Sequence, residues 1–115
     1  MKKLKAVATA SLLVLGLAAL PSVAKAQAPN DARIPKTHHV TIKGFKFDPE
    51  KLEVKAGDTV VWTNEDIVPH TVTAEVFKSK SLDKGESWSL KTKQKGDFPY
   101  ICKFHPSMNA ELIVR

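Results

Sequence analysis

Hydrophobic and polar residues alternate in several short stretches of this chain, beginning at Val40. Side chains two positions apart lie on the same face of a β-strand, so the alternation predicts half-buried strands. Turn-forming residues separate the stretches roughly every 8–12 residues, and no stretch beyond residue 40 keeps the period of a helix. The pattern therefore predicts an all-β sandwich of about seven to eight short strands.

Two details of the pattern add to this prediction. Gly44 breaks the alternation between Val40 and Phe47, which suggests a β-bulge. Trp62 and Trp88 lie in stretches rich in β-forming residues, and we expect both to belong to the core.

The N-terminal region has a different composition. Lysines at 2, 3 and 5 precede an uncharged apolar run over 6–20, and Ala-Lys-Ala follows at 24–26. This order is typical of a secretory signal peptide, which we expect to be cleaved after Ala26. A retained membrane anchor is the alternative, but the run is shorter than the roughly 20 residues of a spanning helix.

The remaining chain is predicted to be a short arm followed by one small domain. Residues 27–37 contain two prolines and three charges and offer little to bury, so we expect a flexible arm. Residues 38–115 would form the domain. His38 and His39 are neighbours in a strand and point to opposite faces, so we expect them to be solvated rather than to bind one ion together.

The net charge says little about function once the signal peptide is removed. Of the 18 Lys and Arg residues, four lie within 1–26, and the rest nearly balance the 12 Asp and Glu residues. A near-neutral domain argues against nucleic-acid binding. Seven lysines would form either a docking patch for an acidic protein or a solvated edge: Lys78, Lys80, Lys84, Lys91, Lys93, Lys95 and Lys103.

The single cysteine indicates metal chemistry. Exported small domains usually pair their cysteines, yet Cys102 has no partner in the sequence. His105 and Met108 follow it at spacings that a tight loop can direct toward one ion. Thiolate, imidazole and thioether ligands together suit copper, and a trigonal copper site needs a second histidine. His70, at the start of a predicted strand, supplies it.

These motifs resemble those of the cupredoxins, most closely the amicyanin- and plastocyanin-like branch. The resemblance covers nearly all of 40–114 and includes Val-Trp-Thr-Asn at 61–64, Pro-His-Thr-Val at 69–72 and Cys-x₂-His-x₂-Met at 102–108. It implies a Greek-key cupredoxin-like sandwich with one type 1 copper. The implied ligands are His70, Cys102, His105 and Met108.

The resemblance also implies roles for two further residues near the copper. Asn64 matches an Asn that braces the two ligand loops and donates a backbone hydrogen bond toward the cysteine sulfur. Phe104 stands where the family commonly has Pro. Unlike Pro, it has an N–H, so we expect a second hydrogen bond to the thiolate and a raised reduction potential.

The expected function is electron transfer in the periplasm, with copper cycling between Cu(II) and Cu(I). The expected partners are a donor dehydrogenase or cytochrome and an acceptor cytochrome or reductase, docking transiently near His105 on a monomer without stable membrane insertion. A periplasmic copper carrier or sequestering protein is the alternative. An enzyme is not expected, because a second copper centre would need more than the four histidines present.

Overall fold

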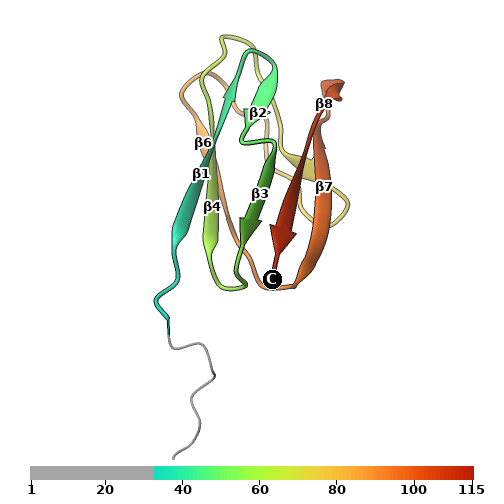
Figure 1. The fold of residues 1–115 in the computed structure, drawn as a ribbon. Coiled ribbons are helices and arrows are strands. Elements are labelled where there is room, and N and C mark those ends of the chain that lie inside the picture. The colour runs from blue at the N-terminus through green and yellow to red at the C-terminus, as the bar shows by residue number, and fades with distance from the viewer. Residues whose placement is uncertain (1–32) are drawn as a thin grey trace, which may run out of the picture. The chain divides into compact units, whose positions relative to one another are not determined.

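The computed structural model describes residues 33–115 as eight strands in two sheets that face each other (Figure 1). Within these residues there is no helix long and apolar enough to cross a membrane. The predicted signal peptide and residues 27–32 of the predicted arm lie outside the described part. The strands are β1 Thr37–Lys43, β2 Lys46–Asp48, β3 Lys51–Val54, β4 Thr59–Asn64, β5 Thr73–Ala74, β6 Ser87–Lys91, β7 Gly96–Cys102 and β8 His105–Val114.

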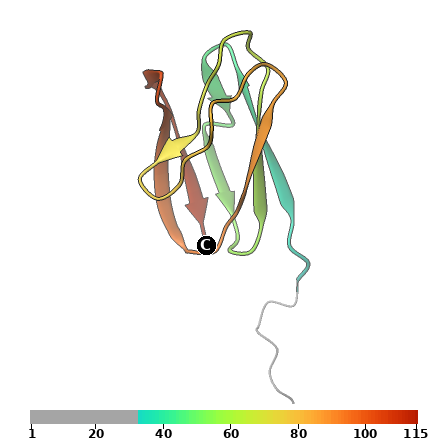
Figure 2. The same ribbon diagram turned by 180° about the vertical axis from the view of Figure 1, so that it is seen from behind.

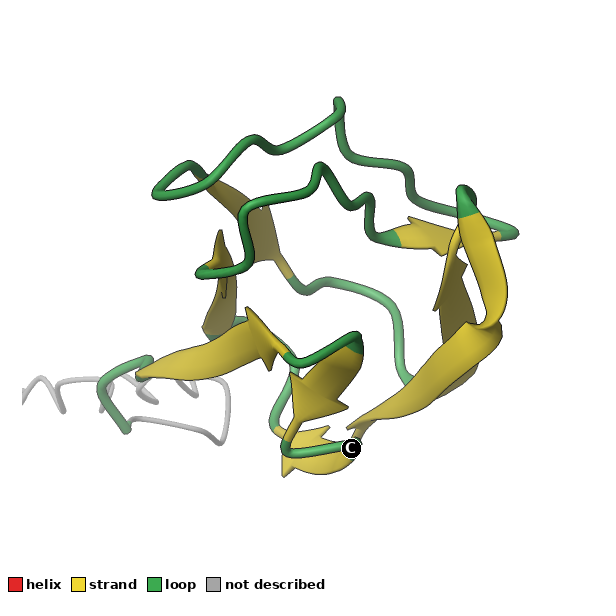
Figure 3. Cartoon of the chain, turned by 90° about the horizontal axis from the view of Figure 1, so that it is seen from above, coloured by secondary structure: helices red, strands yellow, loops and turns green. Residues whose placement is uncertain are grey.

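Each sheet mixes parallel and antiparallel pairs. One sheet has the order β2-β1-β4-β6 and the other the order β3-β8-β7-β5. β1 runs parallel to β4 and β3 parallel to β8, whereas the other neighbours are antiparallel. Figure 2 gives the opposite view, and Figure 3, from above, shows the long loops that cross one end of the sandwich. The predicted all-β sandwich is confirmed.

The core lies between the two sheets and follows the alternating pattern. β4 is the clearest case, because its residues are alternately half-buried and buried. Trp62 of β4 has no exposed surface, and Trp88 of β6 packs against the core beside it. The indole N–H of Trp62 donates to the Tyr100 hydroxyl at 3.0 Å, which satisfies the polar atom that accompanies the buried ring.

Gly44 occupies a turn rather than the predicted bulge. Lys43 pairs with Lys46, so Gly44 and Phe45 form a two-residue connection between β1 and β2. Their φ angles of 63° and 59° are both in the left-handed region, as a type I′ hairpin turn requires. A bulge and a turn both interrupt the alternation of buried and exposed residues, so the phase break at Gly44 does not distinguish them.

Asp58 attaches the start of the described chain to the end of the sandwich where β4 begins. Its buried carboxylate accepts hydrogen bonds from Arg33 Nη1 at 2.8 Å and from the backbone N–H groups of Lys36 and Lys55 at 2.9 and 3.2 Å. The ring of His38 lies 2.9 Å away. His38 is therefore half-buried and paired, not solvated as predicted, and residues 33–36 of the predicted arm are held against the domain.

The hydrogen bonds also decide the charge state of Asp58. Burial alone would raise the pKa of this carboxyl, but the hydrogen bonds from Lys36, His38, Arg33 and Lys55 outweigh it and hold the pKa well below its usual range. The carboxylate is thus ionised in the folded protein even in moderate acid.

We expect Asp58→Asn to lower the free energy of unfolding by about 2 kcal/mol at neutral pH, because charge-assisted hydrogen bonds are lost in a buried place. Because the pKa of Asp58 is depressed in the folded protein, its carboxylate stabilises the fold fully above the unfolded pKa of about 4. This stabilisation declines as the pH falls from there toward the folded-state pKa. Urea denaturation at several pH values should show the difference between wild type and variant narrowing below about pH 4.

Asp97→Asn is the matched control for this prediction, since the Asp97 side chain is 58% exposed and lies 3.4 Å from Arg115. The control should change stability by less than about 0.5 kcal/mol. An equal loss in both variants would contradict the role given to Asp58.

Candidate metal centre

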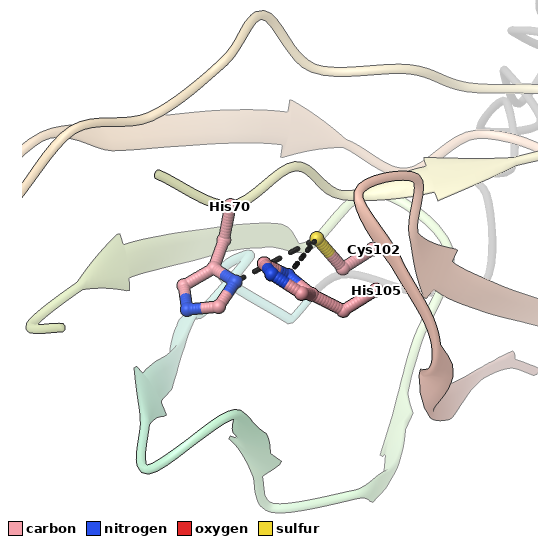
Figure 4. Close-up of side chains that lie close together, drawn as sticks. All are labelled: His70, Cys102 and His105. Carbon is pink, nitrogen blue, oxygen red and sulfur yellow. Dashed lines mark hydrogen bonds between the residues drawn. The ribbon is translucent and has the colours of Figure 1, made fainter. Parts of the chain in front are cut away.

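His70, Cys102 and His105 come together at the end of the sandwich where β7 meets β8, opposite the Asp58 end (Figure 1; Figure 4). Their ligand atoms all lie within 4.8 Å of one another. His70 and Cys102 have no exposed surface, and His105 is half-buried. The three residues singled out by sequence thus form one cluster, although His70 and Cys102 are 32 positions apart.

The irregular junction of β7 and β8 brings the last two residues of this cluster together. Ile101 pairs with Asn109, but Cys102 pairs with His105, so the register shifts and residues 106–108 have no partner on β7. A regular hairpin would send alternate side chains to opposite faces. The shift instead places Cys102 and His105 on either side of a two-residue turn with both ligand atoms directed to the same point.

Distances within the cluster fit a bound metal ion. The Sγ atom of Cys102 lies 3.6 Å from Nδ1 of His70 and 3.5 Å from Nδ1 of His105 (Figure 4). Metal bonds of about 2.3 Å to sulfur and 2.0 Å to nitrogen, meeting at a tetrahedral or trigonal angle, separate the two donors by about 3.5–3.7 Å. The residues present therefore fit a metal held by one sulfur and two imidazoles, a donor set that suits copper.

Met108 lies on β8, three residues beyond His105, and its side chain is almost fully buried in the core cluster. A thioether in this position is a weak, soft ligand of the kind that completes a trigonal copper site. Its coordination stays a prediction.

Asp66 orients His70 through a hydrogen bond. One carboxylate oxygen lies 2.8 Å from Nε2 of His70. Burial raises the pKa of Asp66, but hydrogen bonds from the Phe45 and Gly44 amides and from His70 lower it more, so the carboxylate is ionised and only accepts. In the neutral imidazole Nε2 therefore carries the proton, and the lone pair of Nδ1 points toward Cys102.

Thr71 links the two segments that carry the ligands. Its backbone N–H donates to Cys102 Sγ at 3.4 Å, and its hydroxyl oxygen accepts from the N–H of Lys103 at 2.8 Å. Thr71 is itself buried. A donor to the sulfur stabilises negative charge on the thiolate, so Thr71 serves the ligand as well as the fold.

Asn64 braces only the His70 side of the site, whereas its sequence position predicted contacts to both ligand loops and to the sulfur. Its side-chain amide donates to the carbonyls of Val68 and Leu82 at 2.9 and 2.8 Å, and its side-chain oxygen accepts from the Asp66 amide at 2.8 Å. The amide that reaches the sulfur belongs to Thr71.

The hydrogen bond predicted from the Phe104 amide to the cysteine sulfur is not formed either. Among residues 33–115, the backbone amide that donates to Cys102 Sγ is that of Thr71, and no such bond comes from Phe104. The side chain of Phe104 is instead 45% exposed, and its ring centroid lies 6.4 Å from that of His105. The hydrogen bond that would have raised the reduction potential is therefore absent, and an influence of Phe104 on this potential stays a prediction.

The comparisons with known proteins agree with this geometry. A family model described as a cupredoxin-like domain matches residues 11–114. The chain belongs to this family. The cofactor of this cupredoxin is copper, for which His70, Cys102 and His105 form a possible binding site.

Relatives of this cupredoxin include amicyanins. The cupredoxin is 29% identical over 99 residues to amicyanin from Paracoccus versutus, covering 80% of this chain and 71% of that protein. It is 32% identical over 82 residues to amicyanin from Paracoccus denitrificans, covering 65% of this chain and 63% of that protein. The structure of an amicyanin mutant in its reduced state superposes with a TM-score of 0.65 at 34% identity, covering 69% of this chain and 82% of that one.

We expect Asp66→Asn to weaken Cu(II) binding about 10- to 100-fold, because an amide does not fix the His70 tautomer as a carboxylate does. Competition against a chelator of known affinity measures the effect. Glu65→Gln is the control, since Glu65 is the exposed neighbour in the same loop, and it should bind as the wild type does. Equal affinity in all three proteins would contradict the role assigned to Asp66.

Proposed function

We propose that this cupredoxin is a periplasmic type 1 copper protein that transfers single electrons between redox partner proteins. The observation that carries the proposal is the buried position of Cys102 Sγ, 3.5–3.6 Å from one nitrogen of each histidine. Export to the periplasm rests on the sequence of residues 1–26, which resembles a signal peptide.

The copper ligands in this proposal are Nδ1 of His70, Nδ1 of His105, Sγ of Cys102 and the thioether of Met108. Copper supplies the one-electron chemistry. The protein holds the donors in place through the strand pairing of β7 and β8 and through the contacts of Asp66 and Thr71. The geometry of a site held in this way changes little between the two oxidation states, which favours fast electron transfer. Electron transfer of this kind is not an enzymatic activity.

Partner docking is proposed at the face around His105. Of the three ligands in the cluster, His105 alone is not fully buried. Two large apolar side chains beside His105 are exposed: Phe104, its neighbour in the sequence, is 45% accessible, and Phe45, whose ring contacts that of His105, is 50% accessible. A small apolar surface suits brief encounters between a monomer and a donor dehydrogenase or cytochrome, or an acceptor cytochrome or reductase.

Titration of the protein with Cu(II) should produce an intense visible band from thiolate-to-copper charge transfer, and ascorbate should bleach it reversibly. Cys102→Ser should bind copper without this band, because the thiolate is the source of the transition. Ser107→Ala, a change at an exposed position in the same loop, should keep the band. Visible absorption spectroscopy makes all three measurements.

Two results would count against the proposal. Colourless copper binding by the wild type would mean that Cys102 does not share a plane with the two histidines, and the copper carrier would then be the better assignment. A coloured protein that loses copper within seconds to a chelator in both oxidation states would also favour carriage.

A further inference from the structure

Phe45 combines three features that the copper site does not by itself explain. It is the only residue other than glycine with a left-handed φ, 59°, among residues 33–115. Its ring packs at right angles to both histidine rings of the metal cluster. The side chain is also half exposed to solvent, so burial in the core does not account for its presence.

The backbone conformation is unfavourable for this residue type. The second central position of a type I′ turn is usually Gly, since a Cβ is crowded at positive φ. A bulky aromatic residue there is an outlier, and such outliers concentrate where the side chain or backbone serves a site. Here the turn is fixed because the Asp66 carboxylate accepts from the N–H groups of Gly44 and Phe45 at 2.7 and 3.0 Å.

The ring contacts involve both histidines. The centroid of Phe45 lies 5.2 Å from that of His70 at an interplanar angle of 90°, and 5.0 Å from that of His105 at 88°. Both are T-shaped pairs within the range of favourable aromatic contacts. One carboxylate, that of Asp66, therefore fixes His70 directly and also fixes the turn from which Phe45 reaches both rings.

The two histidines differ in how they are held. The second ring nitrogen of His70 donates a hydrogen bond to Asp66. Metal-binding histidines almost always make such a bond to a carboxylate, a carbonyl or water. Among residues 33–115, no side chain or carbonyl forms a hydrogen bond with Nε2 of His105. Apart from Nδ1, which faces Cys102, the ring of His105 contacts aromatic rings, with Phe45 and His70 closer than Phe104.

We propose that Phe45 is a positioning residue that holds the His105 imidazole in its metal-binding orientation, in place of the hydrogen bond that orients His70. The inference rests on the proposed copper site, but it concerns the orientation of a side chain and can be tested without metal. It also accounts for the strained turn, because the left-handed backbone directs the ring of Phe45 over the two ligands.

The first experiment compares the metal-free wild type with Phe45→Gly and Phe45→Leu by NMR of the histidine ring protons. Phe45→Gly removes the ring and relieves the left-handed backbone, so the melting temperature should be unchanged or higher. The His105 resonances should broaden or shift as the ring samples several orientations. Phe45→Leu keeps an apolar side chain without an aromatic ring and should give an intermediate effect.

Two internal references make the readout specific. The His38 resonances should not change in any variant, because His38 is paired with Asp58 at the other end of the sandwich. Ile67→Ala removes an 81% exposed apolar side chain from the loop before His70 and should leave the His105 resonances as in the wild type. Unchanged His105 resonances in Phe45→Gly would overturn the proposal, and a Phe45→Leu spectrum identical to wild type would overturn the aromatic contact as its cause.

The second experiment measures loss of Cu(I) to excess bathocuproine. If Phe45 restrains His105, Phe45→Gly should release copper about tenfold faster than wild type, whereas Ile67→Ala should not. Equal release rates would overturn the proposal for the loaded protein. If the wild type gives no blue band with copper, the proposed function fails, and the metal-free spectra still decide whether Phe45 orients His105.

Discussion

The carboxylate of Asp66 is the contact on which the arrangement of the metal site depends. It joins the β1–β2 turn to the loop that carries His70, two segments separated by 22 positions in the chain. An ionised carboxylate has enough acceptor capacity for all three donors, and each hydrogen bond is strengthened by its charge. Because one group makes all these contacts, the orientation of His70 and the position of the Phe45 ring cannot vary independently.

The two ends of the sandwich use the same physical device for different purposes. Asp58 and Asp66 are both acidic residues within the protein that are kept ionised by backbone amides and a histidine. At one end this holds the first described residues against the sandwich. At the other end it orients a ligand. Thr71 completes the second end, because it ties the segment after His70 to Cys102 and Lys103.

Local sequence predicts the sheets and the ligands better than it predicts the contacts that support them. The alternation in β4 and the spacing of Cys102, His105 and Met108 are readable because both are properties of one short segment. Thr71 was missed because its role appears only when Cys102, 31 positions away, is placed beside it. Asp66 and Phe45 likewise act across segments. A large apolar residue after a turn glycine was the available signal for Phe45.

The contact of Asp58 with Arg33 has a consequence for how the protein can be handled. The described chain enters the sandwich at the end opposite the metal cluster (Figure 1). An affinity tag, a fluorescent label or a linker to an electrode that is attached before residue 33 would leave the domain at that remote end. The His105 face would then point away from the attachment, and an immobilised layer would present its redox-active side uniformly to the solution.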